Sequence, residues 1–287
     1  MEKKTIIITG GNAGIGKEAA MELAKSGARV IMACRNQDTG KTCRDEIIET
    51  TGNTNVILKK LDLSSFQSVR DFAEDINKNE DRLDVLIHNA GVWLSKNVNN
   101  DDGVDLTMAT NQFGPFLLTH LLIDLLKKSA PSRIVIVSSV SHFFGRLGFD
   151  QSKRYVPSYF PHLNYFNSKF ANVCFANELA LRLKDSNITV NSLHPGIIKT
   201  DIWNTFPAPI SWSVALFSKV FFKTAKEGCE TIVYLAVSED VDGVTGKYFV
   251  DCKKSHMSKR TRSNEFNKKF WEICKDNVGL RNTDVSI

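Results

Sequence analysis

"TGGNAGIG", residues 9–16, lies between the apolar run "TIII" and the helix-forming segment "KEAAMELAKSG". Glycines at positions 10, 14 and 16 allow a tight strand-to-helix turn whose backbone can approach a pyrophosphate, and the N-terminus of the helix offers free N–H groups and positive potential. This arrangement predicts a dinucleotide site. The glycines alone are weak evidence, because a turn that merely needs positive φ has a similar composition.

The rest of the chain repeats this strand-then-helix pattern. The β-rich runs lie at residues 5–9, 28–34, 55–62, 83–88, 133–138, 188–194 and 247–250. The segments with helical periodicity lie at residues 15–26, 39–50, 65–78, 104–128, 165–184 and 225–237. Several strands are apolar at consecutive positions, which is typical of parallel strands buried on both faces. The pattern predicts an α/β fold, a Rossmann-type doubly wound sheet of about seven parallel strands with helices on both faces. We expect a single domain over residues 1–280 and a flexible tail at 281–287.

Composition limits the function classes. A net charge of +5 over 287 residues is mild. The one dense basic run, residues 253–262, lacks interleaved aromatic residues, so we expect a solvated face and no nucleic-acid partner; a phosphate-rich ligand or an anionic lipid surface is the alternative. The six cysteines form no metal-binding pattern, so we expect reduced thiols and no metal site. "MEKK" leads directly into a short strand, so we expect no signal peptide, no transmembrane segment and a cytoplasmic protein.

The ends of the second and third strands indicate which dinucleotide fits. An NAD site places an acidic residue after the second strand, whereas this chain has "ACRN", with Arg35 and no carboxylate before Asp38. This favours NADP(H), although an exposed loop arginine is the simpler interpretation of Arg35 taken alone. After the third strand, Asp62 in "LDLSS" is placed to accept from an adenine amino group. Alternatively, Asp62 belongs to a helix-start turn with Ser64 or Ser65.

The candidate chemistry lies in "YFNSK", where Tyr165 and Lys169 share one face of a helix. A free phenol has a pKa of about 10, and a neighbouring cation favours the phenolate and brings this pKa closer to neutrality. Tyr165 is therefore a candidate acid–base catalyst assisted by Lys169. Tyrosine and lysine occur at this spacing by chance on many helices, so the pair alone does not identify an enzyme.

Two further polar residues strengthen this interpretation. Ser139 follows the strand "RIVIVS" and is placed to donate to a carbonyl oxygen, or simply to cap a turn. Asn111 in "TNQFGPF" lies inside a helical segment, where its side chain could hold a water that carries protons toward Lys169. The alternative for Asn111 is a helix kink beside Gly114 and Pro115.

In combination these motifs resemble the short-chain dehydrogenases/reductases. The resemblance covers nearly the whole chain and rests on "TGGNAGIG", "HNAG" (88–91), "NQFG", "SS", the Tyr165/Lys169 pair and "HPG" (194–196), in that order. Within the family the chain is most similar to the retinol dehydrogenase group, on "ACRN", "LDLSS", "NQFGPFLLTHLL", "SAPSRIVIVSS" and "HPGIIKTDI".

This resemblance implies an NADP(H)-dependent enzyme acting on CH–OH groups, with a catalytic tetrad of Asn111, Ser139, Tyr165 and Lys169. The residues it assigns to the cofactor are Gly10, Asn12, Gly14, Ile15, Gly16, Arg35, Asp62, Leu63, Asn89, Ala90, Gly91, Tyr165, Lys169, Pro195, Gly196, Ile198 and Thr200. The chain departs from the family at His88, where asparagine is usual. Many retinoid enzymes begin with a membrane-anchoring segment, and we expect none here.

Substrate choice is expected to lie in a lid at about residues 197–225. Its segment 202–222 is rich in aromatic residues, among them Trp203, Phe206, Trp212 and Phe217. We expect it to cover a lipophilic aldehyde or ketone, such as retinal, a sterol or an isoprenoid, or the corresponding alcohol. A buried packing helix, or a patch that touches a membrane surface or a second subunit of a homodimer, is the alternative. Two other functions stay open: a catalytically silent NADPH-binding regulatory protein, and a sugar-nucleotide epimerase.

Overall fold

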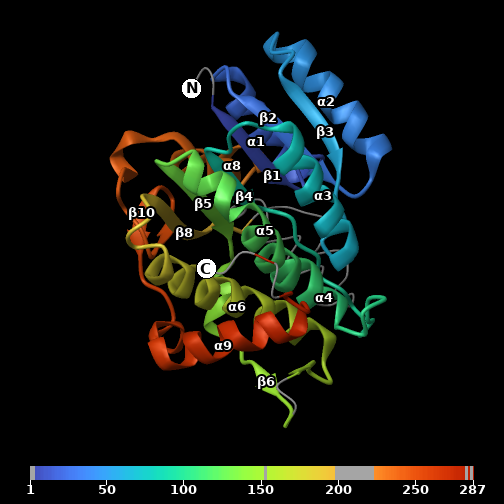
Figure 1. Cartoon of the computed structure of the whole chain (residues 1–287), viewed down its shortest axis with the longest axis vertical. Coiled ribbons are helices and arrows are strands. Elements are labelled where there is room, and N and C mark those ends of the chain that lie inside the picture. The colour runs from blue at the N-terminus through green and yellow to red at the C-terminus, as the bar shows by residue number, and fades with distance from the viewer. Residues whose placement is uncertain (1–3, 152–153, 198–222, 282–283, 285–286) are drawn as a thin grey trace.

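The computed structural model describes residues 4–151, 154–197, 223–281, 284 and 287. Within these residues, an eight-stranded sheet has the order β10-β9-β8-β5-β4-β1-β2-β3 (Figure 1). Its strands are β1 (Thr5–Thr9), β2 (Arg29–Cys34), β3 (Val56–Lys60), β4 (Val85–His88), β5 (Ser132–Val137), β8 (Ile188–His194), β9 (Lys247–Val250) and β10 (Lys253–Ser255). All neighbouring strands run parallel except β10, which is antiparallel to β9. The prediction of seven parallel strands is confirmed.

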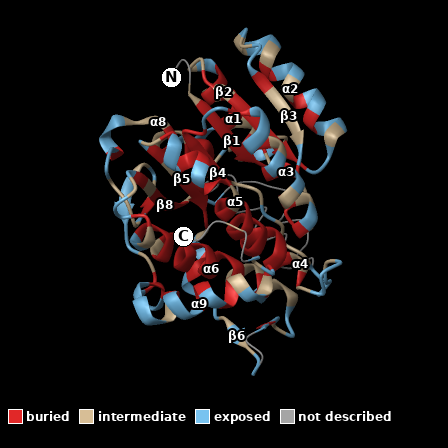
Figure 2. Cartoon of the chain, in the orientation of Figure 1, coloured by how far each residue is buried: buried red, intermediate tan, exposed pale blue. Residues whose placement is uncertain are grey.

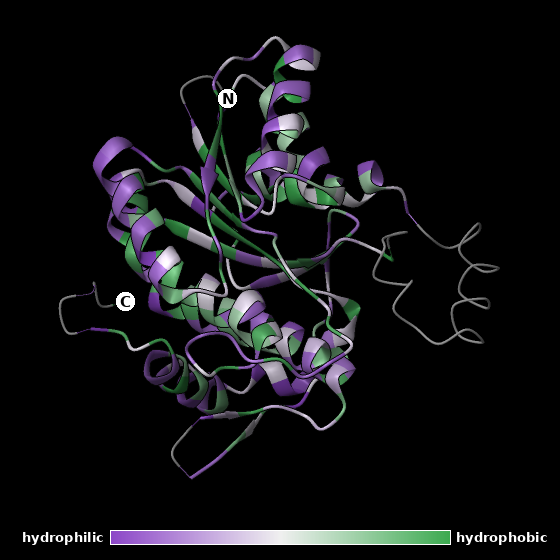
Figure 3. Ribbon diagram, turned by 90° about the vertical axis from the view of Figure 1, so that its right-hand side faces the viewer, coloured by the Kyte–Doolittle hydropathy of each residue, from purple (hydrophilic) through white to green (hydrophobic). Residues whose placement is uncertain are grey.

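Helices cover both faces of this sheet, because its strands are apolar on both sides. Ile6 and Ile8 of β1 pack in the core beneath α1 (Gly14–Lys25), α2 (Gln37–Thr51) and α8 (Ala225–Val237). Ile7, between them, faces the opposite core under three other helices. These are α3 (Phe66–Asn79), α5 (Gly114–Lys128) and α6 (Pro161–Arg182). Figure 2 shows the buried residues concentrated in the strands and the inward helix faces, and Figure 3 shows helices on both sides of the sheet.

The structure adds elements that sequence periodicity does not predict. The single helix predicted over 104–128 is wrong in detail: α4 (Leu106–Met108), a π-helical turn (Ala109–Phe113) and α5 follow one another. Pro115 contributes to this break, because a proline lacks the N–H that would continue the regular hydrogen-bond pattern. Also unpredicted are β10, a short hairpin of β6 (Gly148–Phe149) and β7 (Tyr155–Val156), and α9 (Asn264–Asn277), which packs on α6.

The predicted lid lies almost entirely outside the described residues, and so do Trp203, Phe206, Trp212 and Phe217. Its two ends meet, because the Lys223 N–H donates to the Ile197 carbonyl over 2.8 Å.

The described residues of the predicted tail contact the domain. Arg70 of α3 pairs with Asp284 at 3.0 Å, and Arg182 of α6 donates to the Ile287 carbonyl at 3.0 Å. Separately, none of the helices within the described ranges combines the length and the apolar character needed to cross a membrane.

Candidate active site

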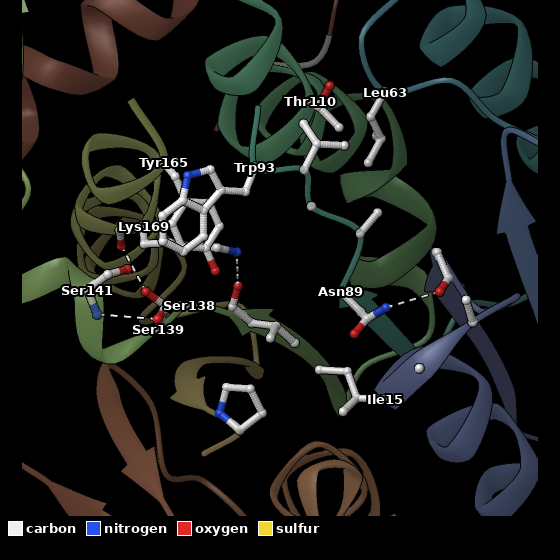
Figure 4. Close-up of a pocket in the computed structure, with 18 of the residues that line it drawn as sticks. Ile15, Leu63, Asn89, Trp93, Thr110, Ser138, Ser139, Ser141, Tyr165 and Lys169 are labelled. Atoms are coloured by element: carbon white, nitrogen blue, oxygen red, sulfur yellow. Dashed lines mark hydrogen bonds between the residues drawn. The ribbon is translucent and has the colours of Figure 1, made fainter. Parts of the chain in front are cut away.

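The loops that follow β1, β2, β3, β4, β5 and β8 line one cavity of about 880 Å³ (Figure 4). Parallel strands place their carboxyl ends at the same edge of the sheet, so these loops gather there. The cavity lies where the strand order reverses between β1 and β4, which is the usual ligand position in an open α/β sheet.

Most of the residues predicted for the site line this cavity. They are Gly10, Asn12, Gly14, Ile15, Arg35, Asp62, Leu63, Asn89, Ala90, Gly91, Ser139, Tyr165, Lys169, Pro195 and Gly196. Gly16 and Asn111 are not among the lining residues, and both act through contacts described below. Ile198 and Thr200 lie outside the described residues.

The glycine-rich turn is held against the loop after β4. A Cβ built on Gly16 would lie 2.3 Å from the Gly10 carbonyl oxygen and 2.4 Å from Asn89 Nδ2. Asn89 Nδ2 itself donates to the carbonyls of Thr9, at 2.9 Å, and Gly10, at 3.2 Å. Gly10 adopts φ +67°, in the left-handed region. Gly16 therefore shapes the site by letting the two loops approach each other, and does not itself line the cavity.

The N-terminus of α1 borders the cavity. Its N-cap residue, Ala13, provides no side-chain hydrogen bond, and its first turn carries no acidic residue. Ala13, Gly14 and Ile15 all line the cavity, so the free N–H groups and the positive end of the helix dipole face a ligand there. Arg35, exposed at the end of β2, adds a cation to the same cavity. This donor set fits a dinucleotide phosphate.

Asp62 lies at the cavity and also forms a turn with Ser64. It lines the cavity, and its Oδ1 accepts from the Ser64 N–H at 2.9 Å and from the Ser64 hydroxyl at 2.6 Å. Ser65 caps the following helix, accepting from the Ser68 N–H at 3.3 Å. The turn therefore fixes Asp62 at the edge of the cavity.

Tyr165, Lys169 and Ser139 come together at the other end of the cavity. Lys169 Nζ lies 5.6 Å from the centre of the Tyr165 ring and donates to the Val137 carbonyl at 2.9 Å. Ser138 ties the same helix to β5, because its hydroxyl donates to the Lys169 carbonyl at 2.8 Å. Ser139 Oγ accepts from the Ser141 N–H at 3.2 Å, so the serine also caps the short helix that follows it.

Burial dominates the ionisation of this pair. It raises the pKa of Tyr165 to about 12, and the hydrogen bond with the Ser139 hydroxyl opposes this shift only in part. Burial also lowers the pKa of Lys169 to about 8. The pKa of Tyr165 therefore lies above that of a free phenol and is not brought closer to neutrality as expected, because desolvation of the phenolate dominates. Near neutral pH, Tyr165 is a phenol that can donate a proton.

Asn111 is buried in the π-helical turn and anchors the loop after β4. Its Oδ1 accepts from the Val92 N–H at 2.7 Å, and its Nδ2 donates to the Val92 carbonyl and to Ser168 Oγ, both at 2.9 Å. A Cβ built on Gly91 would lie 3.4 Å from both Asn111 Oδ1 and Lys169 Nζ, so the two groups flank Gly91. Asn111 therefore lies near Lys169, and it also lies in an irregular part of the helix, as the two interpretations from the sequence expected.

An aromatic group that was not predicted from the sequence lies beside Tyr165. Trp93 lines the cavity and stacks on Tyr165, with ring centres 4.5 Å apart and planes at 6° (Figure 4). Its Nε1 donates to His162 Nδ1 at 2.9 Å. Two signals were available: Trp93 follows "HNAG" at the ligand edge of the sheet, and His162 lies three residues before Tyr165 on the same helix.

His88, the departure from the family pattern, is fully buried behind the site. Its Nε2 meets Thr119 Oγ1 at 2.8 Å, and that hydroxyl donates to the Pro115 carbonyl at 2.8 Å. Thr119 has a single hydroxyl hydrogen, so His88 Nε2 is the donor and Nδ1 is the acceptor. His88 Nδ1 is buried and has no hydrogen-bond partner among the residues that the structure describes, and burial lowers the pKa of the ring to about 3.

Comparisons with known proteins agree with this architecture. The profile of a family described as short chain dehydrogenase matches residues 4–210. Retinol dehydrogenase 14 of Mus musculus is 41% identical over 293 residues, covering 98% of this chain and 87% of that protein. Retinol dehydrogenase 12 of Bos taurus is 43% identical over 281 residues, covering 97% of this chain and 87% of that protein.

Solved structures show the same fold. A crystal structure of an uncharacterised protein from Mycobacterium paratuberculosis superposes with a TM-score of 0.75 at 28% identity, covering 97% of this chain and 94% of the other. A crystal structure of an Escherichia coli CFT073 protein complexed with NADPH gives a TM-score of 0.71 at 27% identity, covering 88% and 98% of the two chains. The Rossmann-type fold and the similarity to retinol dehydrogenases are therefore confirmed.

Proposed function

The chain belongs to the short-chain dehydrogenase family, and from that premise we propose that it is an NADP(H)-dependent oxidoreductase that interconverts a lipophilic aldehyde or ketone and its alcohol. The family supports an oxidoreductase acting on CH–OH groups. The observation that carries the proposal is one cavity with two different ends. Groups that can bind a phosphate, the N-terminus of α1 and Arg35, line one end, and Tyr165, Ser139 and Lys169 line the other. The proposed organisation is one domain over residues 1–280 with a substrate lid at about 197–225.

The cavity residues divide into two groups in this proposal. The N-terminus of α1 and the glycine turn hold the pyrophosphate, and Arg35 pairs with a 2′-phosphate. Asp62 and Leu63 border the adenine, Asn89 to Gly91 border its ribose, and Pro195 and Gly196 border the nicotinamide. The relative complexed with NADPH supports this choice of cofactor. When bound, the nicotinamide supplies the hydride that adds to the carbonyl carbon.

The chain's own residues manage the oxygen and the proton. The Ser139 hydroxyl donates a hydrogen bond to the carbonyl oxygen as negative charge develops on it. Tyr165 transfers its phenolic proton to that oxygen, which completes the alcohol. Lys169, beside Asn111, returns a proton to the phenolate. A pKa of about 12 keeps Tyr165 protonated near neutral pH, which is the form that donates a proton in the reduction.

The substrate is proposed to be lipophilic. Val92, Trp93, Val140, Phe144 and Phe166 line the cavity around Tyr165 and Ser139, and an apolar lining favours an apolar ligand. Two relatives are named for retinol, which supports a lipophilic alcohol or aldehyde.

The experiment is a screen of the purified chain with retinal, a steroid ketone, farnesal and a homologous series of linear aldehydes, each with NADPH and with NADH. Each buried methylene is worth about 0.8 kcal/mol, so kcat/KM should rise roughly fourfold per methylene until the pocket is full. A flat chain-length profile would contradict a lipophilic substrate. Tight NADPH binding without turnover of any carbonyl would favour a regulatory protein, and conversion of a nucleotide sugar would favour an epimerase.

A further inference from the structure

Trp93 is held in place from its backbone. Both backbone groups of the preceding residue, Val92, are bonded to the Asn111 side chain, at 2.7 Å for the N–H and 2.9 Å for the carbonyl. Asn111 is buried and is itself bonded to Ser168 of α6. The loop that carries Trp93 is thus attached to the helix that carries Tyr165.

The indole is also held on its own edges. Its face stacks on Tyr165, its plane meets Phe166 edge-on at 5.7 Å and 70°, and its Nε1 donates to His162 Nδ1 at 2.9 Å. His162 lies three residues before Tyr165 and four before Phe166, so one face of α6 supplies all three contacts. Since an indole N–H can only donate, His162 Nδ1 must accept, and the ring carries its proton on Nε2. Trp93 is therefore a fixed wall of the cavity.

This wall limits the space beside the reacting carbonyl. In the reacting carbonyl group, the oxygen accepts hydrogen bonds from Tyr165 and Ser139, and the carbon is bonded to two substituents. The first atom of each substituent lies within about 2.4 Å of the carbonyl oxygen. The indole covers one face of the phenol at 4.5 Å. A substituent directed to that side would meet the indole, whereas a hydrogen atom needs less room. Phe144 and Ile197 also line the cavity and are 68% and 41% exposed, so a longer substituent beside them has an apolar path toward solvent.

From this geometry, and resting on the proposed carbonyl reductase function, we infer that Trp93 determines substrate specificity and selects aldehydes over ketones. The aldehyde hydrogen occupies the position beside the indole, and the apolar chain extends toward Phe144. His162 is a positioning residue that acts by fixing the indole.

The test compares a linear aldehyde with the methyl ketone of equal carbon number, decanal and 2-decanone, with NADPH as reductant. The wild-type chain should prefer decanal. Trp93→Ala should raise the ratio of kcat/KM for 2-decanone to that for decanal by roughly 10- to 100-fold, because one carbon more or less in a tight site is worth about that much. Trp93→Phe should give an intermediate ratio. Val98→Ala, on the same loop but 45% exposed and not lining the cavity, is the matched control and should keep the wild-type ratio.

Two variants test the positioning role of His162. His162→Phe removes the acceptor for the indole N–H and should shift the ratio in the same direction as Trp93→Ala, by a smaller factor. His162→Asn places an amide oxygen at the position of Nδ1, so it should keep the wild-type ratio of kcat/KM for 2-decanone to that for decanal. A purely structural role for His162 would lower the melting temperature in both variants without moving the ratio.

The outcomes separate this inference from the proposed function. No turnover of either compound by the wild-type chain refutes the proposed function itself. Turnover with a wild-type preference for 2-decanone, or a Trp93→Ala ratio within about twofold of wild type, overturns the inference while the function stands. If Trp93→Ala fails to fold, as judged by circular dichroism, the Trp93→Phe ratio decides.

Discussion

Replacing Gly16 with alanine should destabilise the folded chain before it affects any ligand. The added Cβ would lie 2.3 Å from the Gly10 carbonyl oxygen and 2.4 Å from Asn89 Nδ2, both far inside normal contact distance. These two atoms hydrogen-bond to each other at 3.2 Å, so the loops can relieve the clash only by moving apart and losing that bond. Overpacking costs about 1–3 kcal/mol and the lost hydrogen bond costs about 1 kcal/mol.

The sum is about 2–4 kcal/mol in the free energy of unfolding. An unfolding entropy of about 2.1 cal/mol/K per residue amounts to about 0.6 kcal/mol/K for this chain length, so the melting temperature should fall by about 3–7 °C. Two matched variants separate the cost of placing alanine at positive φ from the cost of crowding. Gly14→Ala and Gly52→Ala both place alanine at positive φ, +54° and +70°, with no atom within 4 Å of the new Cβ. Each should cost about 1–2 kcal/mol, or about 2–3 °C.

Gly14 lines the cavity and Gly52 ends α2 outside it, which separates cofactor binding from stability. Melting curves of the ligand-free protein and fluorescence titrations with NADPH measure the two properties. The NADPH dissociation constant should rise at least about tenfold for Gly14→Ala and stay unchanged for Gly52→Ala. Equal NADPH affinity in these two variants would show that the cavity is not the cofactor site. A Gly16→Ala melting temperature no lower than that of Gly52→Ala would refute the argument from crowding.

Three further predictions concern single side chains. Tyr165→Phe should reduce turnover by orders of magnitude with NADPH affinity nearly kept, because only the proton donor is removed; steady-state kinetics showing activity within about tenfold of wild type would rule out its catalytic role. Arg35→Asp should raise KM for NADPH far more than for NADH, since a carboxylate repels a 2′-phosphate and accepts from a 2′-hydroxyl; an unchanged ratio of the two KM values would mean that Arg35 is only a surface residue. Burial lowers the pKa of His88 from 6.5 to about 3, so the folded state binds fewer protons and the stabilisation is complete above pH 6.5 and is lost as the pH falls toward 3. By pH 5 the loss is about 2 kcal/mol in the free energy of unfolding. In urea unfolding at a series of pH values, this free energy should fall less steeply toward acid pH for His88→Asn than for the wild type, whereas an identical dependence would contradict a buried neutral histidine.

The sequence by itself determined the sheet and most of the residues around its ligand edge. Strands such as β1 are apolar at consecutive positions, and only burial on both faces satisfies that pattern. The polar and glycine residues that interrupt the pattern, such as Gly10, Asp62 and Ser139, lie within two residues of a strand end. Because parallel strands end at one edge, such residues must meet there, and a local signal becomes a prediction about the site.

The tertiary structure alone decided what those residues touch. Trp93 and Tyr165 are far apart in the chain, and Asn111 and His162 help to hold the indole where the two rings stack. The function of Gly16 depends on Asn89, which comes from another strand's loop. The pKa of Tyr165 is set by the depth of its burial, and spacing on a helix shows only that Lys169 is near. Periodicity records which face of an element is buried, whereas clashes, stacking and desolvation depend on distances between elements that are fixed only when the chain has packed.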